Sequence, residues 1–83
     1  MTDQPTPSLR FMVTCLEGGQ CTVNFEPEGA QVLLSAGGIL RVEITGQDDD
    51  ELEISYVPGG LVIGAWSGAK TQVWDRAGRS VPI

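Results

Sequence analysis

The sequence has no histidine, only two cysteines in 83 residues, and five basic residues against eleven acidic ones. Without histidine, imidazole acid–base catalysis, histidine metal ligation and histidine pH switching are excluded. The net charge of −6 argues against nucleic acid and anionic membrane surfaces, because both are bound largely through basic side chains. We therefore expect neither nucleic acid nor membrane as a partner.

Long apolar runs are also missing, and none approaches the ~20 residues of a membrane helix. The polar N-terminus carries Pro5 and Pro7 but no signal-peptide pattern, so we expect a cytoplasmic location. Residues 1–7 are expected to form a flexible tail. Residues 8–83 are enough for one domain with a modest core, and we expect a single all-β domain there.

Glycine and proline interrupt the chain so often that most uninterrupted segments are too short for a stable helix. Residues 40–45 and 51–56 alternate strictly between apolar and polar side chains, the pattern of strands with one buried face. The sequence predicts a small antiparallel sandwich or barrel of about six to eight short strands. Residues 69–77 fit either a strand or one short C-terminal helix, and residues 80–83 are expected to form an edge strand.

Short connections suggest which strands pair. Residues 11–15 are expected to pair with 21–25, and 31–36 with 39–45 through Gly37-Gly38. A third hairpin is expected to join 40–45 to 51–56, so that apolar residues of the two strands share one face. The predicted core is Phe11, Val13, Val23, Phe25, Leu34, Leu40, Val42, Ile44, Leu52, Ile54, Tyr56, Leu61, Ile63 and Trp66.

Cys15 and Cys21 flank a glycine-containing turn, and the expected hairpin places them opposite each other. Two alternatives stay open, namely reduced thiols acting as small apolar side chains and a cross-strand disulfide. A metal or redox pair is disfavoured, because no other cysteine or histidine completes a ligand set. We expect no metal and no other cofactor.

The densest charge lies in Asp48, Asp49, Asp50 and Glu51. Adjacent acids diverge and do not follow a calcium-loop spacing, so a solvated turn is the simpler interpretation. The alternative is contact with a basic partner or with the basic C-terminal region.

Trp66 and Trp74 are the largest side chains, and each is a candidate for the core or for a binding surface. Trp74 is the better surface candidate, because polar residues surround it and Arg76 lies two positions away. Together Trp74 and Arg76 suggest a recognition patch.

No catalytic set is evident. The S-x-x-K match at Ser67–Lys70 lacks the accompanying motifs of enzymes that use it. We therefore expect no enzyme but a small non-catalytic protein–protein interaction or accessory module that self-associates into a homo-oligomer. One alternative is an acidic inhibitor or immunity-type protein that binds a basic partner. The other is a β-domain that binds a small ligand such as a sugar, with a tryptophan lining a pocket between sheets.

Overall fold

The computed structural model describes residues 8–16, 18–46 and 51–83, and it has seven strands and no helix within those ranges. The strands are β1 (Ser8–Thr14), β2 (Gln20–Glu26), β3 (Ala30–Ser35), β4 (Ile39–Thr45), β5 (Glu53–Val57), β6 (Gly60–Gly64) and β7 (Lys70–Trp74). The prediction of an all-β fold is confirmed. The ambiguous segment 69–77 contains a strand, and the alternative of a C-terminal helix is wrong.

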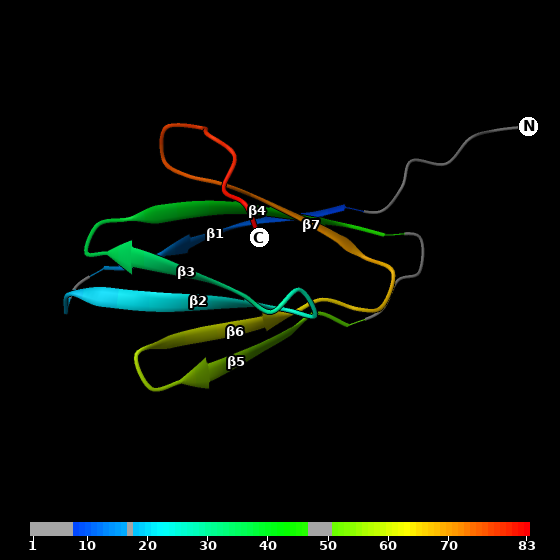
Figure 1. Ribbon diagram of the computed structural model, residues 1–83, viewed down its shortest axis with the longest axis horizontal. Helices are drawn as coiled ribbons and strands as arrows, with labels where there is room; N and C mark the ends of the chain where they lie inside the picture. Colours follow the sequence, from blue (N-terminus) through cyan, green and yellow to red (C-terminus); the bar gives the residue numbers. More distant parts are fainter. Residues whose placement is uncertain (1–7, 17, 47–50) are drawn as a thin grey trace, which may run out of the picture.

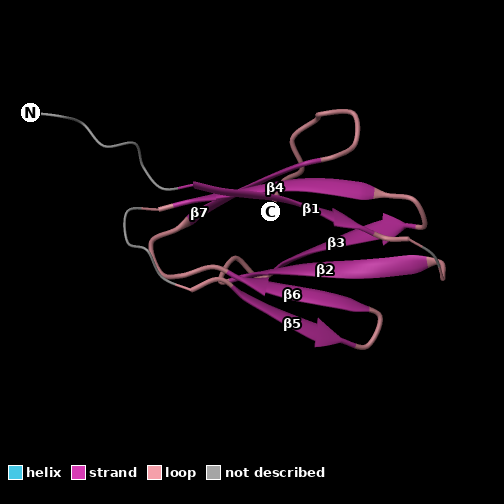
Figure 2. Ribbon diagram, turned by 180° about the vertical axis from the view of Figure 1, so that it is seen from behind, coloured by secondary structure: helices cyan, strands magenta, loops and turns pink. Residues whose placement is uncertain are grey.

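Two sheets form a sandwich, one with the strand order β1-β4-β7 and the other with the order β3-β2-β6-β5 (Figure 1). Seen from behind, the three-stranded sheet again forms the upper layer and the four-stranded sheet fans out below it (Figure 2). All neighbouring strands are antiparallel except β2 and β6, which run parallel. The parallel pair departs from the purely antiparallel expectation. It needs glycine at position 60, because a Cβ atom there would collide with the Thr22 carbonyl.

The core lies between the sheets and is built from alternate residues of the strands, because successive side chains of a strand point to opposite faces. In β4 the three inward residues Leu40, Val42 and Ile44 are at most 2% exposed. The other buried residues are Cys15, Val23, Phe25, Leu34, Ile63 and Val73. The inward faces of β2 and β4 were therefore predictable from their alternation.

Three expected hairpins are wrong, namely those joining β1 to β2, β3 to β4 and β4 to β5. In each case the consecutive strands lie in different sheets. A short loop can join neighbours in one sheet or carry the chain across the core, and both arrangements bury the same apolar faces. At the β3–β4 crossing, Gly37 N donates to the Cys15 carbonyl at 2.6 Å, and Cys15 N donates to the Gly38 carbonyl at 3.1 Å. These bonds tie the crossing to the end of β1.

The hairpins that do form are β2–β3 and β5–β6. Because β5 pairs with β6 at a sheet edge rather than with β4, two predicted core residues are exposed, Ile54 by 53% and Tyr56 by 87%. The prediction that they lie in the core is therefore wrong, because it assumed that β5 pairs with β4. The other predicted core residues are buried or half-buried.

Residues 80–83 do not form the expected edge strand. A single antiparallel bridge joins Ser80 to Trp74, and Val81 N donates to the Val73 carbonyl at 2.8 Å. Val81 and Ile83 pack against the core. The chain end therefore lies along β7 and closes that side of the sandwich.

A disulfide joins Cys15 to Cys21, whose Cα atoms are 5.9 Å apart. Of the two alternatives left open, the structure contains the disulfide. Its position differs from the expected one, because it links the end of β1 in one sheet to β2 in the other rather than two strands of a hairpin. Cys15 is 1% exposed, so the bond lies at the margin of the core.

Candidate functional site

The outer face of the three-stranded sheet brings together residues from three distant parts of the sequence. Pairing aligns Arg41 of β4 with Met12 of β1 on one side and with Trp74 of β7 on the other. Directly opposed residues of paired strands share a face, and these three alternate with the inward core residues. They form a row across the sheet, which we call the Met12–Arg41–Trp74 row.

A groove of about 620 Å³ follows this row. Arg41 Nη1 donates weakly to Met12 Sδ at 3.5 Å, and Arg10 Nε donates to Glu43 Oε2 at 2.7 Å. Trp74 is half-buried, whereas Met12 is 57% exposed. The groove is lined by Arg10, Phe11, Met12, Arg41, Val42, Glu43 and Trp74. Its chemistry is that of two guanidinium groups, one of them paired with the Glu43 carboxylate, beside an indole ring and a thioether.

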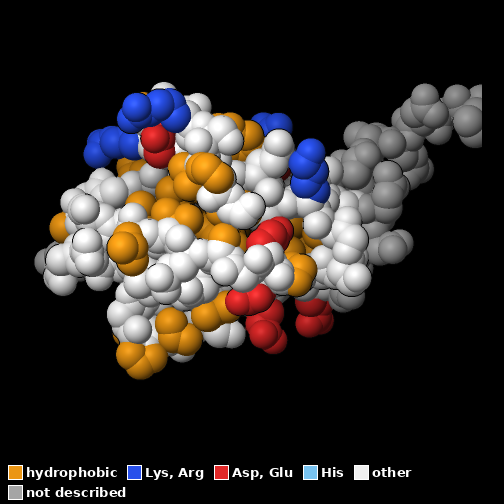
Figure 3. Space-filling view, viewed as in Figure 1, with side chains coloured by type: hydrophobic (Ala, Val, Ile, Leu, Met, Phe, Trp, Pro, Cys, Tyr) orange, Lys and Arg blue, Asp and Glu red, His pale blue; other side chains and the backbone are white. Residues whose placement is uncertain are grey.

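Charge is divided between the two sheets. The basic residues of the chain lie on the outer face of the β1–β4–β7 sheet or in the turn after β7, and they are Arg10, Arg41, Lys70, Arg76 and Arg79. Of the eleven acids, Glu43 and Asp75 accompany them, and the others belong to other segments. In Figure 3 the basic side chains lie at the top and most acidic ones below. The groove, which is lined by two arginines and one glutamate, therefore lies on the more basic of the two sheets.

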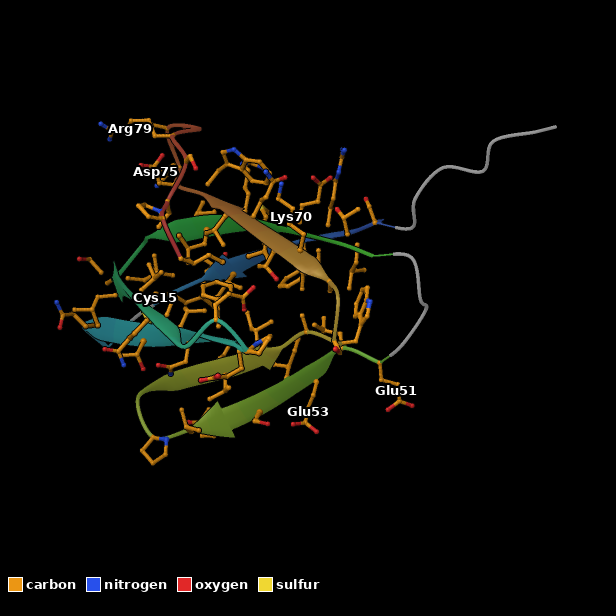
Figure 4. All side chains as sticks on the ribbon, turned by 45° about the vertical axis from the view of Figure 1, so that its right-hand side comes forward. Cys15, Glu51, Glu53, Lys70, Asp75 and Arg79 are labelled. Atoms are coloured by element: carbon orange, nitrogen blue, oxygen red, sulfur yellow. A yellow bond between two sulfur atoms is a disulfide. The ribbon has the colours of Figure 1, made fainter. Side chains whose placement is uncertain are left out.

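The turn that follows β7 is held by one carboxylate. Asp75 Oδ1 accepts hydrogen bonds from Ala77 N and Arg79 N, both at 2.9 Å, and Asp75 Oδ2 lies 3.3 Å from Arg79 Nε. The hydrogen bond from Arg79 N, aided by the charge of Arg79, lowers the pKa of Asp75 despite an opposing desolvation effect. Figure 4 shows Asp75 and Arg79 together on this turn.

The predicted patch of Trp74 and Arg76 is arranged differently from the sequence expectation. Trp74 does lie on an outer face, but Arg76 Nη1 donates to the Gly37 carbonyl at 3.3 Å, and Arg76 does not line the groove. Arg41 takes the place beside Trp74 that the sequence interpretation gave to Arg76. The sequence does not show that Arg41 and Trp74 are neighbours, because contacts between strands depend on the order of the strands in the sheet.

Trp66 is half-buried and does not lie on an open binding surface of either groove. It packs against the core, and its Nε1 is buried with no hydrogen-bond partner in the described part of the chain. Trp66 lines neither the groove beside Trp74 nor a second groove of about 400 Å³ between β1, β2, β5 and β6. It is therefore poorly placed to contact a ligand in either groove.

Most of the acidic run Asp48–Glu51 lies outside the described residues. Asp48, Asp49 and Asp50 are outside the described residues, and Glu51 is exposed just before β5. Figure 4 shows Glu51 and Glu53 on the side of the molecule away from Lys70 and Arg79. Within residues 8–16, 18–46 and 51–83, no three Cys, Asp or Glu side chains form a cluster that could hold a metal ion.

Sequence reasoning missed Arg10, Met12 and Arg41. A signal for their orientation was present, because alternation in 9–15 and 40–45 directs all three away from the core. No local pattern indicated that β4 lies between β1 and β7, and that order is what assembles the row.

Comparison of the sequence with protein-family models finds no match, and no significant match appears among curated proteins or solved structures. The described residues include no helix of the length and apolarity that a membrane crossing requires.

Proposed function

We propose that this protein is a non-catalytic interaction module that binds an anionic segment of a protein partner on the outer face of its β1–β4–β7 sheet. The observation that carries the proposal is the Met12–Arg41–Trp74 row with its groove. Tryptophan and arginine are enriched among residues that dominate binding energy, and arginine pairs bidentately with carboxylates.

The arrangement suits a side chain or backbone laid across the sheet. Among the described residues, the Arg41 guanidinium donates only to the weak acceptor Met12 Sδ, so most of its donors point to no protein acceptor. Arg10 is already held by Glu43 and contributes charge rather than a vacant donor set. Arg41 is therefore the residue on which anion recognition depends most.

The test is titration of the ¹⁵N-labelled protein with a hexaglutamate peptide, followed through its two resolved indole N–H signals. We expect the Trp74 signal to shift and the buried Trp66 signal to stay in place. Arg41→Gln should weaken binding by about tenfold, which corresponds to ~1.4 kcal/mol. Arg79→Gln removes an equally basic but groove-distant side chain and should leave binding unchanged.

An unmoved Trp74 signal, or equal binding by the Arg41→Gln variant, would contradict the proposal. A groove of about 620 Å³ also lies in the size range of small-molecule sites. Inorganic phosphate and citrate therefore form a second arm of the titration. Tighter binding of either than of the peptide would favour the small-ligand function over the protein-binding one.

The alternative of an acidic inhibitor rests on Asp48–Asp50, which the structure does not describe, and on Glu51. No described geometry adds support to it. Charge neutralisation of these four acids, followed by a pull-down on a cationic resin-bound protein such as lysozyme, remains its direct test.

The cytoplasmic location stays a prediction, and the Cys15–Cys21 disulfide makes it testable. Glutathione and thioredoxin keep cytosolic thiols reduced. Acid quenching of cells, followed by alkylation of the denatured protein, should modify both cysteines if the protein is cytoplasmic. Unmodified cysteines would instead place the protein in an oxidising compartment.

A further inference from the structure

Within residues 8–16, 18–46 and 51–83, no strand covers the apolar surface on one side of the sandwich. Pairing places Ile54 and Tyr56 of β5 on the same face as Ile63 and Leu61 of β6, which is the core side. Ile63 is 1% exposed, whereas Ile54 is 53% and Tyr56 is 87% exposed. The three-stranded sheet therefore ends before it reaches β5, and a core-facing apolar strip is left open.

The unpaired edge of the other sheet lies on this same side. Val13 of β1 lines the groove of about 400 Å³ together with Tyr56 and Leu61. Within the described residues β1 has a strand neighbour only in β4, and β5 only in β6. Leu9, on the core side of β1, is 41% exposed. Two free strand edges and exposed core-side residues thus occur together, which is how sheets recruit further strands.

The opposite side of the sandwich is closed by the chain itself. Ser80 bridges to Trp74, Val81 and Ile83 pack on the core, and Arg76 reaches the Gly37 carbonyl. Only the side bearing β1 and β5 therefore offers both an edge and an apolar face among the described residues.

One sheet has three strands and the other has four, so β5 extends beyond β1 on this side. If a second copy is rotated by 180° about the strand direction, its projecting β5 lies beside β1 of the first copy, and the β5 of the first copy lies beside β1 of the second. We propose that a second copy of this chain occupies the open side, with β1 of each copy pairing with β5 of the other. The β1–β4–β7 sheet of one copy then continues into the β5–β6–β2–β3 sheet of its partner. The uncovered strips around Ile54 and Tyr56 face each other, and the interface is closed and isologous.

The strand directions suit this pairing. β5 runs antiparallel to β6, which is parallel to β2, and the disulfide joins the last part of β1 to the first part of β2. β1 and β5 therefore run the same way, as both arrows do in Figure 1. A half-turn about the strand axis keeps this direction, so β1 and the partner's β5 form a parallel pair.

Charge favours the same arrangement. Val13 and Tyr56 line one groove and so lie at similar heights along their strands. Three residues earlier on each strand stand Arg10 and Glu53, both of them exposed, and Arg10 is also paired with Glu43 of its own chain. Pairing of β1 with the partner's β5 brings these opposite charges together on the outer surface, where they steer association and register.

This self-association uses the sandwich edge and does not rest on anion binding beside Trp74. The first measurement is the solution mass by light scattering and sedimentation equilibrium from ~10 μM to ~1 mM, a range that covers weak to moderate affinities. We expect twice the monomer mass at the upper concentrations. A monomer throughout this range would overturn the proposal.

Matched variants locate the interface. Ile54→Lys should raise the dissociation constant by about tenfold or more, the effect expected from burying a charge in an apolar contact. Leu33→Lys changes an equally exposed apolar residue of β3, at 56% against 53%, and should leave the mass unchanged. Both positions are exposed, so both variants keep the monomer fold. Loss of the dimer in Leu33→Lys but not in Ile54→Lys would overturn the assignment to β5.

Charge reversal tests the pairing of β1 with β5. In a Glu43→Gln background, which removes the carboxylate that Arg10 already pairs with, Arg10→Glu and Glu53→Arg should each weaken the dimer, and the two together should recover it. If Glu53→Arg has no effect, the dimer does not pair β1 with β5 and the proposal fails. Trp74→Ala should leave the mass unchanged, which separates failure of this inference from failure of the proposed binding face.

Discussion

Strands β4 and β5 share the same alternation of apolar and polar residues, but their core-facing side chains are buried in β4 and exposed in β5. Both alternate apolar with charged or polar residues, from Leu40 to Ile44 in one and from Leu52 to Tyr56 in the other. The inward side chains of β4 are at most 2% exposed, but Ile54 and Tyr56 of β5 are mostly exposed. The difference is position, since β4 is the middle strand of one sheet and β5 the edge strand of the other.

The comparison teaches that alternation identifies the face a strand turns toward the core but not whether anything covers that face. β4 lies between β1 and β7 and opposite the inner face of the second sheet. β5 turns the same kind of face toward a space that the smaller sheet does not reach. Burial then depends on the number of strands opposite, which the pattern of one strand does not encode.

The largest difference in the free energy of unfolding is expected when one isoleucine in each strand is replaced by alanine. Ile44→Ala removes a fully buried side chain and should lower the free energy of unfolding by about 2–5 kcal/mol. Ile54→Ala in dilute protein should cost less than about 1 kcal/mol, because the site is exposed. Urea denaturation followed by circular dichroism gives both values, and equal losses would contradict the comparison.

A smaller difference in stability is expected between alanine substitutions of two glycines, one after β4 and one opposite β5. A Cβ atom at Gly46, which follows β4, would lie 2.6 Å from Trp66 Nε1. Gly46→Ala should therefore cost about 1–3 kcal/mol through overpacking. At Gly64, opposite Glu53 of β5, the nearest atom would be 3.7 Å away, so Gly64→Ala should be close to neutral. Similar losses of thermal stability for both would show that the β4 end is no more tightly packed.

The smallest effect is expected at the turn that closes the β7 side. The lowered pKa of Asp75 means that its carboxylate stabilises the fold fully above its unfolded pKa. This contribution is lost as the pH falls through the lower, folded pKa. Asp75→Asn should therefore reduce the melting temperature at pH 7 and make no difference in strong acid. A difference between wild type and variant that stays constant down to pH 2 would exclude this origin.

Much of the local structure was predictable. The glycine and proline positions delimit the observed strands closely, and alternation assigned the inward faces of β2 and β4, because both signals act within a few residues. Strand neighbours were predicted poorly, since Gly37-Gly38 allowed a hairpin and a crossing equally well. The candidate site was half predictable, because Trp74 was singled out while Arg41 and Met12 depend on sheet order.

The sequence by itself determined that the chain forms short strands with one apolar face, and that histidine chemistry is absent. Tertiary structure alone decided that the chain crosses between sheets after β1, β3, β4 and β6, that basic residues far apart in the chain share one face, and that no described strand covers β5. The physical reason is the distance along the chain over which each kind of interaction acts. Backbone preference and side-chain alternation act between near neighbours, whereas sheet order is settled by the total apolar area buried across the whole core.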